Sequence, residues 1–322
     1  MKAAVSNKYG PPDILELKEV EKPVPRDNQV LVKIYASSVN YGNLVLLKGK
    51  PFLARFAFGL FKPKYTIPGG DIAGRVEAVG KEVKQFQPGD EVFGDLSGYG
   101  WGAFAEYACV PENALAPKPY NLSFEEAAAI PMAGVTALQS LRNKGNIQSG
   151  QKVLINGASG GVGTFAVQIA KSFGAEVTGV CSTRNLDILR SLGADYAIDY
   201  TKEAFTKSLQ LYDLILGVNG YQSIFAYKRA LNQKGIFIHV GGSGAQMFQA
   251  MILGPLISMA ESKKMSSFLQ RANQKDLIFI KELVEAGKVR PIIDRCYTLR
   301  EVSEAFKYFT KGHAQGKVVI TM

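Results

Sequence analysis

The sequence predicts an α/β protein in which a β-rich domain is joined to a doubly wound parallel sheet. The chain has 322 residues, a length that corresponds to about two domains. Short β-branched runs separated by glycine and proline turns fill the first 120 residues, for example at 30–35 and 74–79, and this pattern is typical of a β-rich domain. From about residue 150 to 245 strand-like and helical patterns alternate, which predicts parallel strands joined by crossover helices.

The β-rich pattern ends near residue 123, where the sequence predicts the start of a helix. Ser123 stands three residues before Glu126, which is the spacing of a capping box. Alanine-rich helical sequence follows and is interrupted at Pro131. Strands and helices then alternate. The expected strands are residues 152–155, 176–180, 196–198, 214–216 and 235–240. The expected helices begin at 162, span 185–192 and lie near 222–231.

Composition and charge limit the classes of protein that the chain can belong to. Hydrophobic residues make up 47% and charged residues 20%, which excludes a disordered chain, a disulfide-stapled module and a collagen-like fibre. Three widely spaced cysteines form no disulfide framework and indicate a reducing compartment. The net charge of +10 favours an anionic partner. Since the basic residues are dispersed, we expect that partner to be a phosphorylated cofactor rather than nucleic acid.

Two observations concern membranes. No segment has 18 consecutive apolar residues, and residues 1–5 begin a strand-like pattern rather than a signal peptide, so we expect a soluble, cytoplasmic protein. Residues 52–64, however, combine aromatic, apolar and basic side chains. This stretch is too short to span a bilayer. It could line an apolar substrate mouth, make a peripheral contact with an anionic membrane surface, or pack as an inserted loop.

A glycine-rich turn follows the strand expected at 152–155. Ala158, Gly160 and Gly163 fit a variant of the G-x-G-x-x-G turn, with alanine in place of the first glycine. In that turn main-chain N–H groups and a helix N-terminus hold a pyrophosphate. The third glycine also permits the close approach of helix and strand that a dinucleotide-binding fold needs.

The same turn satisfies a rival pattern. Residues 157–161 read G-x-S-x-G, which is the nucleophile elbow of a serine hydrolase, with Ser159 as the nucleophile. Asp213 with either His239 or His313 would complete a triad in the required chain order. Gly163 and the alternating strands favour the dinucleotide site over this alternative.

The end of the second predicted strand indicates which dinucleotide binds. A fold selective for NAD carries an acidic residue there, about 20 residues after the glycines, to hold the ribose hydroxyls. Here Ser182, Thr183 and Arg184 occupy the position, and no acid is present. The hydroxyls and the guanidinium suit a 2′-phosphate. The sequence therefore predicts NADPH as the cofactor.

Taken in order, these motifs resemble the medium-chain dehydrogenase/reductase superfamily, and within it the zinc-independent quinone oxidoreductase branch. The resemblance covers nearly the whole chain and rests on residues 1–5, 9–12, 37–40, 68–74, 86–92, 128–137, 158–163, 192–195 and 316–319. It implies a Rossmann dinucleotide-binding domain at residues 123–274. It also implies a GroES-like β-rich catalytic domain at residues 1–122, to which residues 275–322 return.

The resemblance also implies the site residues. Asn40 corresponds to the asparagine beside the nicotinamide and the substrate, although this chain continues Tyr41, Gly42, Asn43 where the family often has Pro-x-Asp. Together with Asn40, the residues expected to bind the cofactor are Thr136, Ser159, Gly160, Gly161, Val162, Gly163, Ser182, Arg184, Tyr200, Val240 and Gly241. Tyr41, Tyr65 and Tyr99 are candidate proton donors, of which Tyr41 lies beside Asn40 in the sequence.

No zinc site is expected. Gly70 stands where the zinc-dependent relatives carry a histidine, and no cysteine precedes Cys109, whereas a zinc site needs three or four converging ligands. Without a Lewis acid a localised alkoxide is not stabilised, but the delocalised anion of a quinone or enone can be supported by hydrogen bonds. We therefore expect NADPH-dependent hydride transfer to a small apolar quinone or α,β-unsaturated carbonyl, with Asn40 among the supporting groups.

Alternatives remain open at this level. A protein on the same fold could bind NADPH or nucleic acid without catalysis. The apolar run at residues 251–259 lies where relatives often form dimers, so a homodimer is expected, although the run could equally belong to the buried core.

Overall fold

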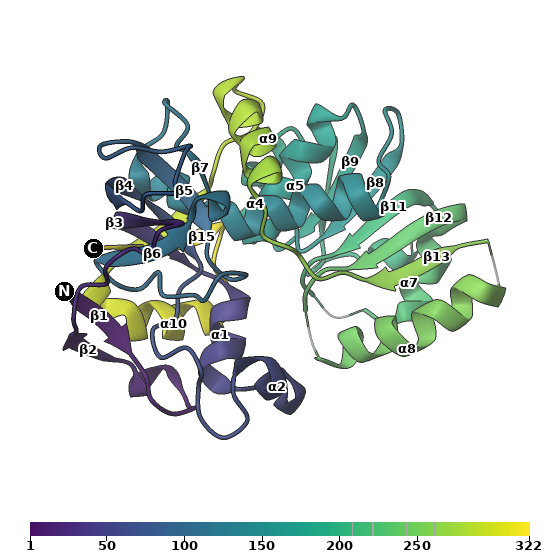
Figure 1. Ribbon diagram of the computed structural model, residues 1–322. Coiled ribbons are helices and arrows are strands. Elements are labelled where there is room, and N and C mark those ends of the chain that lie inside the picture. Colours follow the sequence, from purple (N-terminus) through teal and green to yellow (C-terminus); the bar gives the residue numbers. More distant parts are fainter. Residues whose placement is uncertain (208, 221, 243, 261) are drawn as a thin grey trace. The chain divides into compact units, whose positions relative to one another are not determined.

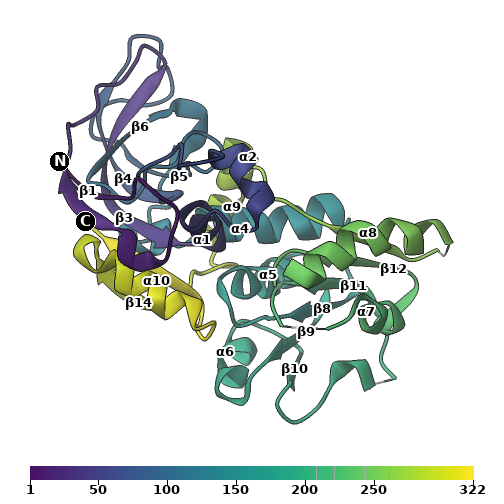
Figure 2. The ribbon, with the colours of Figure 1, turned by 90° about the horizontal axis from the view of Figure 1, so that it is seen from below.

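The computed structural model describes residues 1–207, 209–220, 222–242, 244–260 and 262–322. The chain forms two compact units (Figure 1). The first unit comprises residues 1–135, 271–286 and 291–322, and the second comprises residues 136–270 and 287–290. Both chain termini lie on the first unit and close to each other in the two views (Figure 2). No helix in the part of the chain that the structure describes is long and apolar enough to cross a membrane.

The described residues of the first unit form a seven-stranded sheet and a separate two-stranded sheet. The large sheet has the order β14-β15-β3-β4-β5-β7, and β6 pairs with β3. Its strands are β3 (Gln29–Val39), β4 (Asp71–Val79), β5 (Glu91–Asp95), β6 (Tyr107–Pro111), β7 (Leu115–Pro117), β14 (Ile293–Thr298) and β15 (Lys317–Thr321). β1 (Lys2–Val5) pairs with β2 (Glu16–Glu19). The order places the last strand of the chain beside β3, so residues near 317 adjoin residues near 40.

Helices accompany this sheet. They are α1 (Tyr41–Lys48), α2 (Arg55–Phe58), α3 (Phe124–Ala128), α9 (Gln274–Glu285) and α10 (Val302–Thr310). The predicted capping box is confirmed at the start of α3, where Ser123 Oγ accepts from Glu126 N at 3.2 Å and Glu126 Oε2 accepts from Ser123 N at 2.9 Å. α4 (Pro131–Leu138) begins at the proline that interrupts the preceding helix, as expected of a residue that lacks an N–H but fits the first helical turn.

Among the described residues of the second unit, six strands form a wholly parallel sheet. They are β8 (Lys152–Asn156), β9 (Glu176–Cys181), β10 (Tyr196–Asp199), β11 (Tyr212–Gly217), β12 (Leu231–His239) and β13 (Lys264–Ser267). The order β10-β9-β8-β11-β12-β13 is the 3-2-1-4-5-6 order of the Rossmann fold. The accompanying helices are α5 (Gly161–Ser172), α6 (Leu186–Ser191), α7 (Ile224–Ala230) and α8 (Gly244–Ala260). Strand order therefore reverses between β8 and β11, the point at which such sheets bind ligands.

The division into compact units runs through α4, between residues 135 and 136. The functional domain boundaries predicted at 122/123 and 274/275 remain a prediction.

Candidate active site

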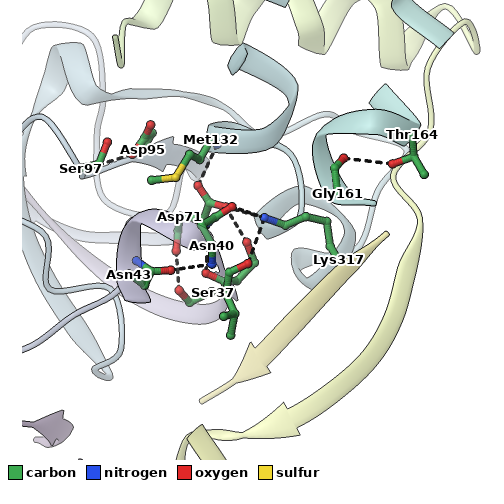
Figure 3. A network of polar contacts seen from close by, with 12 residues as sticks. Ser37, Asn40, Asn43, Asp71, Asp95, Ser97, Met132, Gly161, Thr164 and Lys317 are labelled. Atoms are coloured by element: carbon green, nitrogen blue, oxygen red, sulfur yellow. Dashed lines mark hydrogen bonds and ion pairs between the residues drawn. The ribbon is translucent and has the colours of Figure 1, made fainter. Parts of the chain in front are cut away.

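Three neighbouring strands of the first unit end at the same place and bring polar residues together. Ser38 in β3 is opposite Asp71, the first residue of β4. Val39 in β3 is opposite Val318 in β15, so Lys317 starts β15 beside the end of β3. Asn40 follows β3 directly and precedes α1. Residues that are distant in the sequence therefore meet because their strands are adjacent. We call Ser38, Asn40, Asp71 and Lys317 the Asp71 cluster (Figure 3).

Asp71 is the centre of this cluster. Its side chain is fully buried, and both carboxyl oxygens accept hydrogen bonds. Oδ2 accepts from Ser38 Oγ at 2.5 Å and from Asn40 Nδ2 at 2.7 Å, and Oδ1 accepts from Met132 N at 2.8 Å. Met132 is the second residue of α4, whose first N–H groups have no acceptor within the helix. Asp71 therefore connects the sheet to the start of a helix.

Lys317 supplies the positive charge of the cluster. Only 3% of its side chain is exposed, and its Nζ lies 3.4 Å from Asp71 Oδ2. Nζ also donates to Asn40 Oδ1 at 2.5 Å and to Val39 O at 3.4 Å. Burial lowers the pKa of Lys317, while the adjacent Asp71 carboxyl acts in the opposite direction. A buried ammonium is tolerated where a partner charge and hydrogen bonds compensate its lost hydration, and this cluster provides both.

The side-chain amide of Asn40 has one defined orientation as a result. Its Nδ2 donates to Asp71 Oδ2 and, at 3.4 Å, to Ser38 O, and its Oδ1 accepts from Lys317. An amide has two N–H donors and two lone pairs on oxygen, so both donors are used within the protein. What Asn40 retains for a ligand is one lone pair of Oδ1. The cluster thus orients the predicted site asparagine as an acceptor.

The residues that follow Asn40 differ in exposure. Tyr41 is the first residue of α1 and is exposed, so its hydroxyl is accessible to solvent. Asn43 is buried, and its Oδ1 accepts from Asn40 N at 2.7 Å. Its Nδ2 has no hydrogen-bond partner among the described residues. An aspartate would accept the same hydrogen bond without this unsatisfied donor, so the departure from the family pattern has a visible structural consequence.

The other two candidate proton donors lie elsewhere in the first unit. Tyr65 and Tyr99 are both half-buried. Burial raises the pKa of Tyr99, and the nearby Asp95 adds to this shift. Among the described residues, no hydrogen bond joins either of them to Asn40, and Tyr41 follows Asn40 directly in the chain, so Tyr41 stays the predicted proton donor.

Gly70 occupies the position that carries a metal-binding histidine in zinc-dependent relatives, and side chains of neighbouring residues lie close to it. A Cβ built on Gly70 would lie 3.0 Å from Met132 Cε and 3.4 Å from a ring carbon of Trp101, so a histidine there would require these side chains to shift. Of the two histidines, His313 is exposed in the first unit, and His239 belongs to β12 of the second unit, where burial lowers its pKa. Within the described residues no three His, Cys, Asp or Glu side chains could hold a metal ion. The donor set of the described residues therefore does not fit zinc.

The glycine-rich turn of the second unit lies between β8 and α5. Gly157 has φ +86°, which favours glycine, and Gly160 is the N-cap of α5. A Cβ on Gly163 would lie 2.2 Å from Gly157 O, whereas a Cβ on Gly160 would have 3.7 Å to its nearest neighbour, also Gly157 O. Gly163 thus permits close packing of helix on strand, and Gly160 leaves open space where a phosphate would approach. The turn fits the pyrophosphate of a dinucleotide.

The turn after β9 contains the residues expected to hold the 2′-phosphate. Thr183–Asn185 form one turn of 3₁₀-helix, in which Arg184 is exposed. Tyr200, also exposed, is held beside this turn because its N–H donates to Cys181 O at 3.0 Å. The segment that carries Ser182 and Arg184 therefore adjoins Tyr200 along the backbone. Hydroxyls and a guanidinium are groups that suit a phosphate dianion, and their role in binding one stays a prediction.

Two buried residues link this turn to its surroundings, and sequence reasoning missed both. Asn185 Nδ2 donates to Ser159 Oγ at 2.9 Å and to Ser182 Oγ at 3.3 Å, which connects the turn after β9 with the glycine-rich turn. Asp199, at the end of β10, accepts from Thr183 Oγ1 at 2.5 Å and from the hydroxyl and N–H of Thr201. The hydrogen bond from Thr183 is the main cause that holds the pKa of Asp199 at about 2.

The residues expected near the nicotinamide are placed as follows. Val240 N and Gly241 N both donate to Gly217 O, at 2.9 and 3.2 Å. They therefore pass across the carboxyl end of β11, beside the switch point of the sheet. Thr136 lies in α4, and its carbonyl accepts from Ser140 Oγ.

The geometry argues against a triad made of Ser159 and Asp213. Ser159 Oγ is occupied by Asn185 and lies beyond the carboxyl end of β8. Asp213 accepts from Lys152 N at 2.8 Å, which places it at the amino end of the same strand. At about 3.3 Å per residue, the length of β8 separates the two by more than 10 Å. Asp213 therefore cannot complete a triad with Ser159.

Two residues of the Asp71 cluster were also missed as functional residues. Asp71 and Lys317 occurred in the motifs that carry the resemblance, but no local pattern marks a lone aspartate at a strand start or a lysine in a terminal strand as partners. The available signal was a charged residue at the first position of each strand, directly before buried apolar residues. That signal shows a buried charge without showing its partner.

Comparisons with known proteins agree with this geometry. Residues 26–120 match the family described as alcohol dehydrogenase GroES-like domain, and residues 192–320 match the zinc-binding dehydrogenase family. The 2-methylene-furan-3-one reductase of Solanum lycopersicum is 37% identical over 99% of this chain and 79% of its own length. The chloroplast envelope quinone oxidoreductase homolog of Arabidopsis thaliana is 36% identical, with 95% and 93% covered. The quinone oxidoreductase structure from Coxiella burnetii has a TM-score of 0.87 at 30% identity, covering 100% of this chain and 99% of its own.

The fold and the two sites define a nucleotide-dependent oxidoreductase that has a separate catalytic domain. The chain belongs to the medium-chain dehydrogenase/reductase superfamily, in its quinone oxidoreductase branch. The predicted fold class, a GroES-like domain with a Rossmann domain, is confirmed.

Proposed function

We propose that this protein is an NADPH-dependent reductase of small apolar quinones and α,β-unsaturated carbonyls. The observation that carries the proposal is the turn after β9, which contains Ser182 and Arg184 and no acidic residue, and beside which the backbone of Tyr200 is held. The relatives named as a furanone reductase and a quinone oxidoreductase homolog support the acceptor class.

The cofactor would be held by the second unit. The main-chain N–H groups at the start of α5 would bind the pyrophosphate, with Ser159, Gly160, Gly161, Val162 and Gly163 shaping that turn. Val240, Gly241 and Thr136 would adjoin the nicotinamide. When bound, NADPH supplies a hydride. Asn40 and Tyr41 would contact the substrate from the first unit.

The donor set of the first unit determines which acceptors suit the site. Gly70 stands where a metal-binding histidine would be, and the described residues contain no group of three side chains that could hold a metal ion, so this site offers hydrogen bonds rather than a metal ligand set. Such groups can support a charge that is spread over the several atoms of an enolate or hydroquinone anion. Both N–H donors of Asn40 are used within the protein, so Asn40 does not supply the hydrogen bond to this anion that the sequence led us to expect. Its Oδ1 would instead accept from a ligand N–H or O–H. Hydrogen bonds to the anion would come from Tyr41 or from solvent, and Tyr41 would donate the proton that completes reduction. Saturated ketones, whose reduction leaves a localised alkoxide, are expected to be poor substrates.

A panel of acceptors tests the proposal. NADPH oxidation is measured with a short-chain quinone, a short enone and the matched saturated ketone, and each is repeated with NADH. We expect turnover of the quinone or the enone with NADPH and at most slow turnover of the saturated ketone. NADPH binding without oxidation of any acceptor would instead support a non-catalytic nucleotide-binding protein. Metal analysis of protein purified without an affinity tag is expected to find less than stoichiometric zinc.

The proposal includes a homodimer in the cytoplasm. α8 supports association because Phe248, Met251, Leu256 and Met259 are all exposed on it, and monomers rarely leave such an apolar surface uncovered. Sedimentation equilibrium of the wild type and of Met251→Ser with Leu256→Ser tests the dimer. Weaker self-association of the variant is expected.

A further inference from the structure

Residues 48–64 of the first unit form a segment that the proposed reaction does not use. We call it the apolar-basic segment. It contains the end of α1, a 3₁₀ turn at Phe52–Ala54 and α2, and α2 lies at the lower edge of the first unit in Figure 1. Its large apolar side chains are exposed to an unusual degree. The exposed fractions are 58% for Phe52, 74% for Leu53, 70% for Phe56 and 89% for Phe61.

The segment is held to the first unit from its inner side. Arg55 donates from Nε to Gly49 O at 3.1 Å, and its guanidinium lies 4.5 Å from the ring centre of Tyr9. Tyr9 in turn donates to Gly59 O at 2.5 Å. Phe58 packs edge-on against Trp101, with 6.0 Å between ring centres. These contacts fix the backbone of the segment, so the exposed side chains project outward from an anchored support.

All charged residues of the apolar-basic segment are positively charged. Lys48, Lys50, Arg55, Lys62 and Lys64 are its charged residues, and the sequence has no acidic residue between positions 41 and 70. Lys50, Lys62 and Lys64 are exposed among the apolar side chains. Aromatic and aliphatic side chains combined with lysines are the composition by which interfacial segments bind the headgroup region of an anionic bilayer.

We propose that the apolar-basic segment docks the protein onto an anionic lipid surface. Phe52, Leu53, Phe56 and Phe61 would enter the interface, and the lysines beside them would meet the lipid phosphates. A second copy of this chain is the less suitable occupant, because a symmetric contact would bring two sets of cations together. This inference does not depend on the proposed reductase activity.

Flotation with lipid vesicles tests the proposal. Wild-type protein is mixed with vesicles of phosphatidylcholine alone and of phosphatidylcholine with phosphatidylglycerol. We expect binding to the anionic vesicles, little binding to the neutral ones, and release by salt because the lysine contribution is screened. Absence of binding to anionic vesicles at low salt, or equal binding to both kinds, would overturn the proposal.

Paired variants separate the contribution of the apolar side chains to vesicle binding from the contribution of the lysines. Phe56→Ser with Phe61→Ser removes exposed apolar area, and its matched control is Val24→Ser, since Val24 is 82% exposed elsewhere in the first unit. Lys62→Glu with Lys64→Glu reverses two charges, and its control is Lys288→Glu with Lys311→Glu. We expect each segment variant to weaken vesicle binding by at least about tenfold, because each lysine near an anionic surface contributes roughly fivefold. The controls are expected to weaken it less than threefold.

Two other results would assign the segment a different role and reject lipid docking. If the serine variant raises KM for a water-soluble quinone while vesicle binding stays unchanged, the segment lines a substrate mouth. If that variant loses self-association in sedimentation but keeps vesicle binding, the segment is a contact between copies. NADPH oxidation with a water-soluble acceptor is expected to be the same in all these variants.

Discussion

The Asp71 cluster of the first unit and the glycine-rich turn of the second are built in opposite ways. The cluster consists of side chains from strands far apart in the sequence, and Asp71 and Lys317 are almost completely buried. The turn consists mainly of backbone from consecutive residues, 157–163, most of it half-buried. In the cluster, charges compensate one another inside the protein. In the turn, the groups that would compensate a ligand charge remain available.

The comparison shows which substitutions are expected to change folding stability and which are expected to change ligand binding alone. A change in the cluster removes a partner from a buried charge, so it affects folding first. A change in the turn removes space or a donor that only the ligand needs, so it affects binding first. Five substitutions test this difference, from the largest expected effect to the smallest.

The largest effect is expected for Lys317→Met. The substitution leaves the buried Asp71 carboxyl without its cation, and removing one member of a buried ion pair costs about 3–5 kcal/mol. The free energy of unfolding in urea measures the loss. The double variant Lys317→Met with Asp71→Asn removes both charges and is expected to recover part of the stability. A loss below about 1 kcal/mol in the single variant would show that the pair does not act as described.

Arg184→Ala is expected to affect the ligand alone. A hydrogen bond to a charged group contributes roughly 1.5–3 kcal/mol, so NADPH binding should weaken by roughly 10- to 100-fold. NADH lacks the 2′-phosphate, and its affinity should hardly change. The dissociation constants of both cofactors are measured by fluorescence titration, and stability should match the wild type. Equal weakening of both cofactors would remove Arg184 from the phosphate site.

Gly163→Ala and Gly160→Ala test the two functions of the glycine-rich turn separately. Gly163 permits close packing of helix on strand, and Gly160 leaves space for a phosphate. The new Cβ at 163 would lie 2.2 Å from Gly157 O, and such overpacking costs about 1–3 kcal/mol, so both stability and NADPH binding should fall. At 160 the new Cβ makes only an ordinary van der Waals contact, 3.7 Å from Gly157 O. Gly160→Ala should therefore weaken NADPH binding while the free energy of unfolding changes by less than about 0.5 kcal/mol. Unchanged NADPH binding in this second variant would contradict the assignment of that space to a phosphate.

Thr183→Val is expected to have the smallest effect and a characteristic pH dependence. The hydrogen bond from Thr183 lowers the pKa of Asp199 to about 2, below the usual value of about 3.9. A depressed folded-state pKa stabilises the protein above the unfolded value, and this stability disappears as pH falls through about 2. The variant should thus be less stable than wild type at neutral pH, and the difference should vanish near pH 2. Thr183→Ser keeps the hydroxyl and serves as the control, and an NMR titration of Asp199 reports the pKa directly.

Elements with a local cause were predictable from the sequence. The capping box at Ser123 and Glu126 depends on two residues three positions apart, and it forms as expected. The alternation of strands and helices identified the parallel sheet, and the spacing of Gly160 and Gly163 identified the turn between β8 and α5. In each case the physical cause lies within a few residues or within one repeating period, so the amino-acid order contains it.

The Asp71 cluster was decided by the tertiary structure. Lys317 is 246 residues from Asp71 and 277 from Asn40 in the sequence, and they meet because β15 returns to pair with β3. A single sequence does not state which strands become neighbours or in which register, since that depends on the packing of the whole sheet. The Thr183–Asp199 hydrogen bond could not be predicted for the same reason, because it forms only when β10 lies beside β9. The sequence determined which residues could bind a dinucleotide, and strand pairing alone decided which buried charges support the site asparagine.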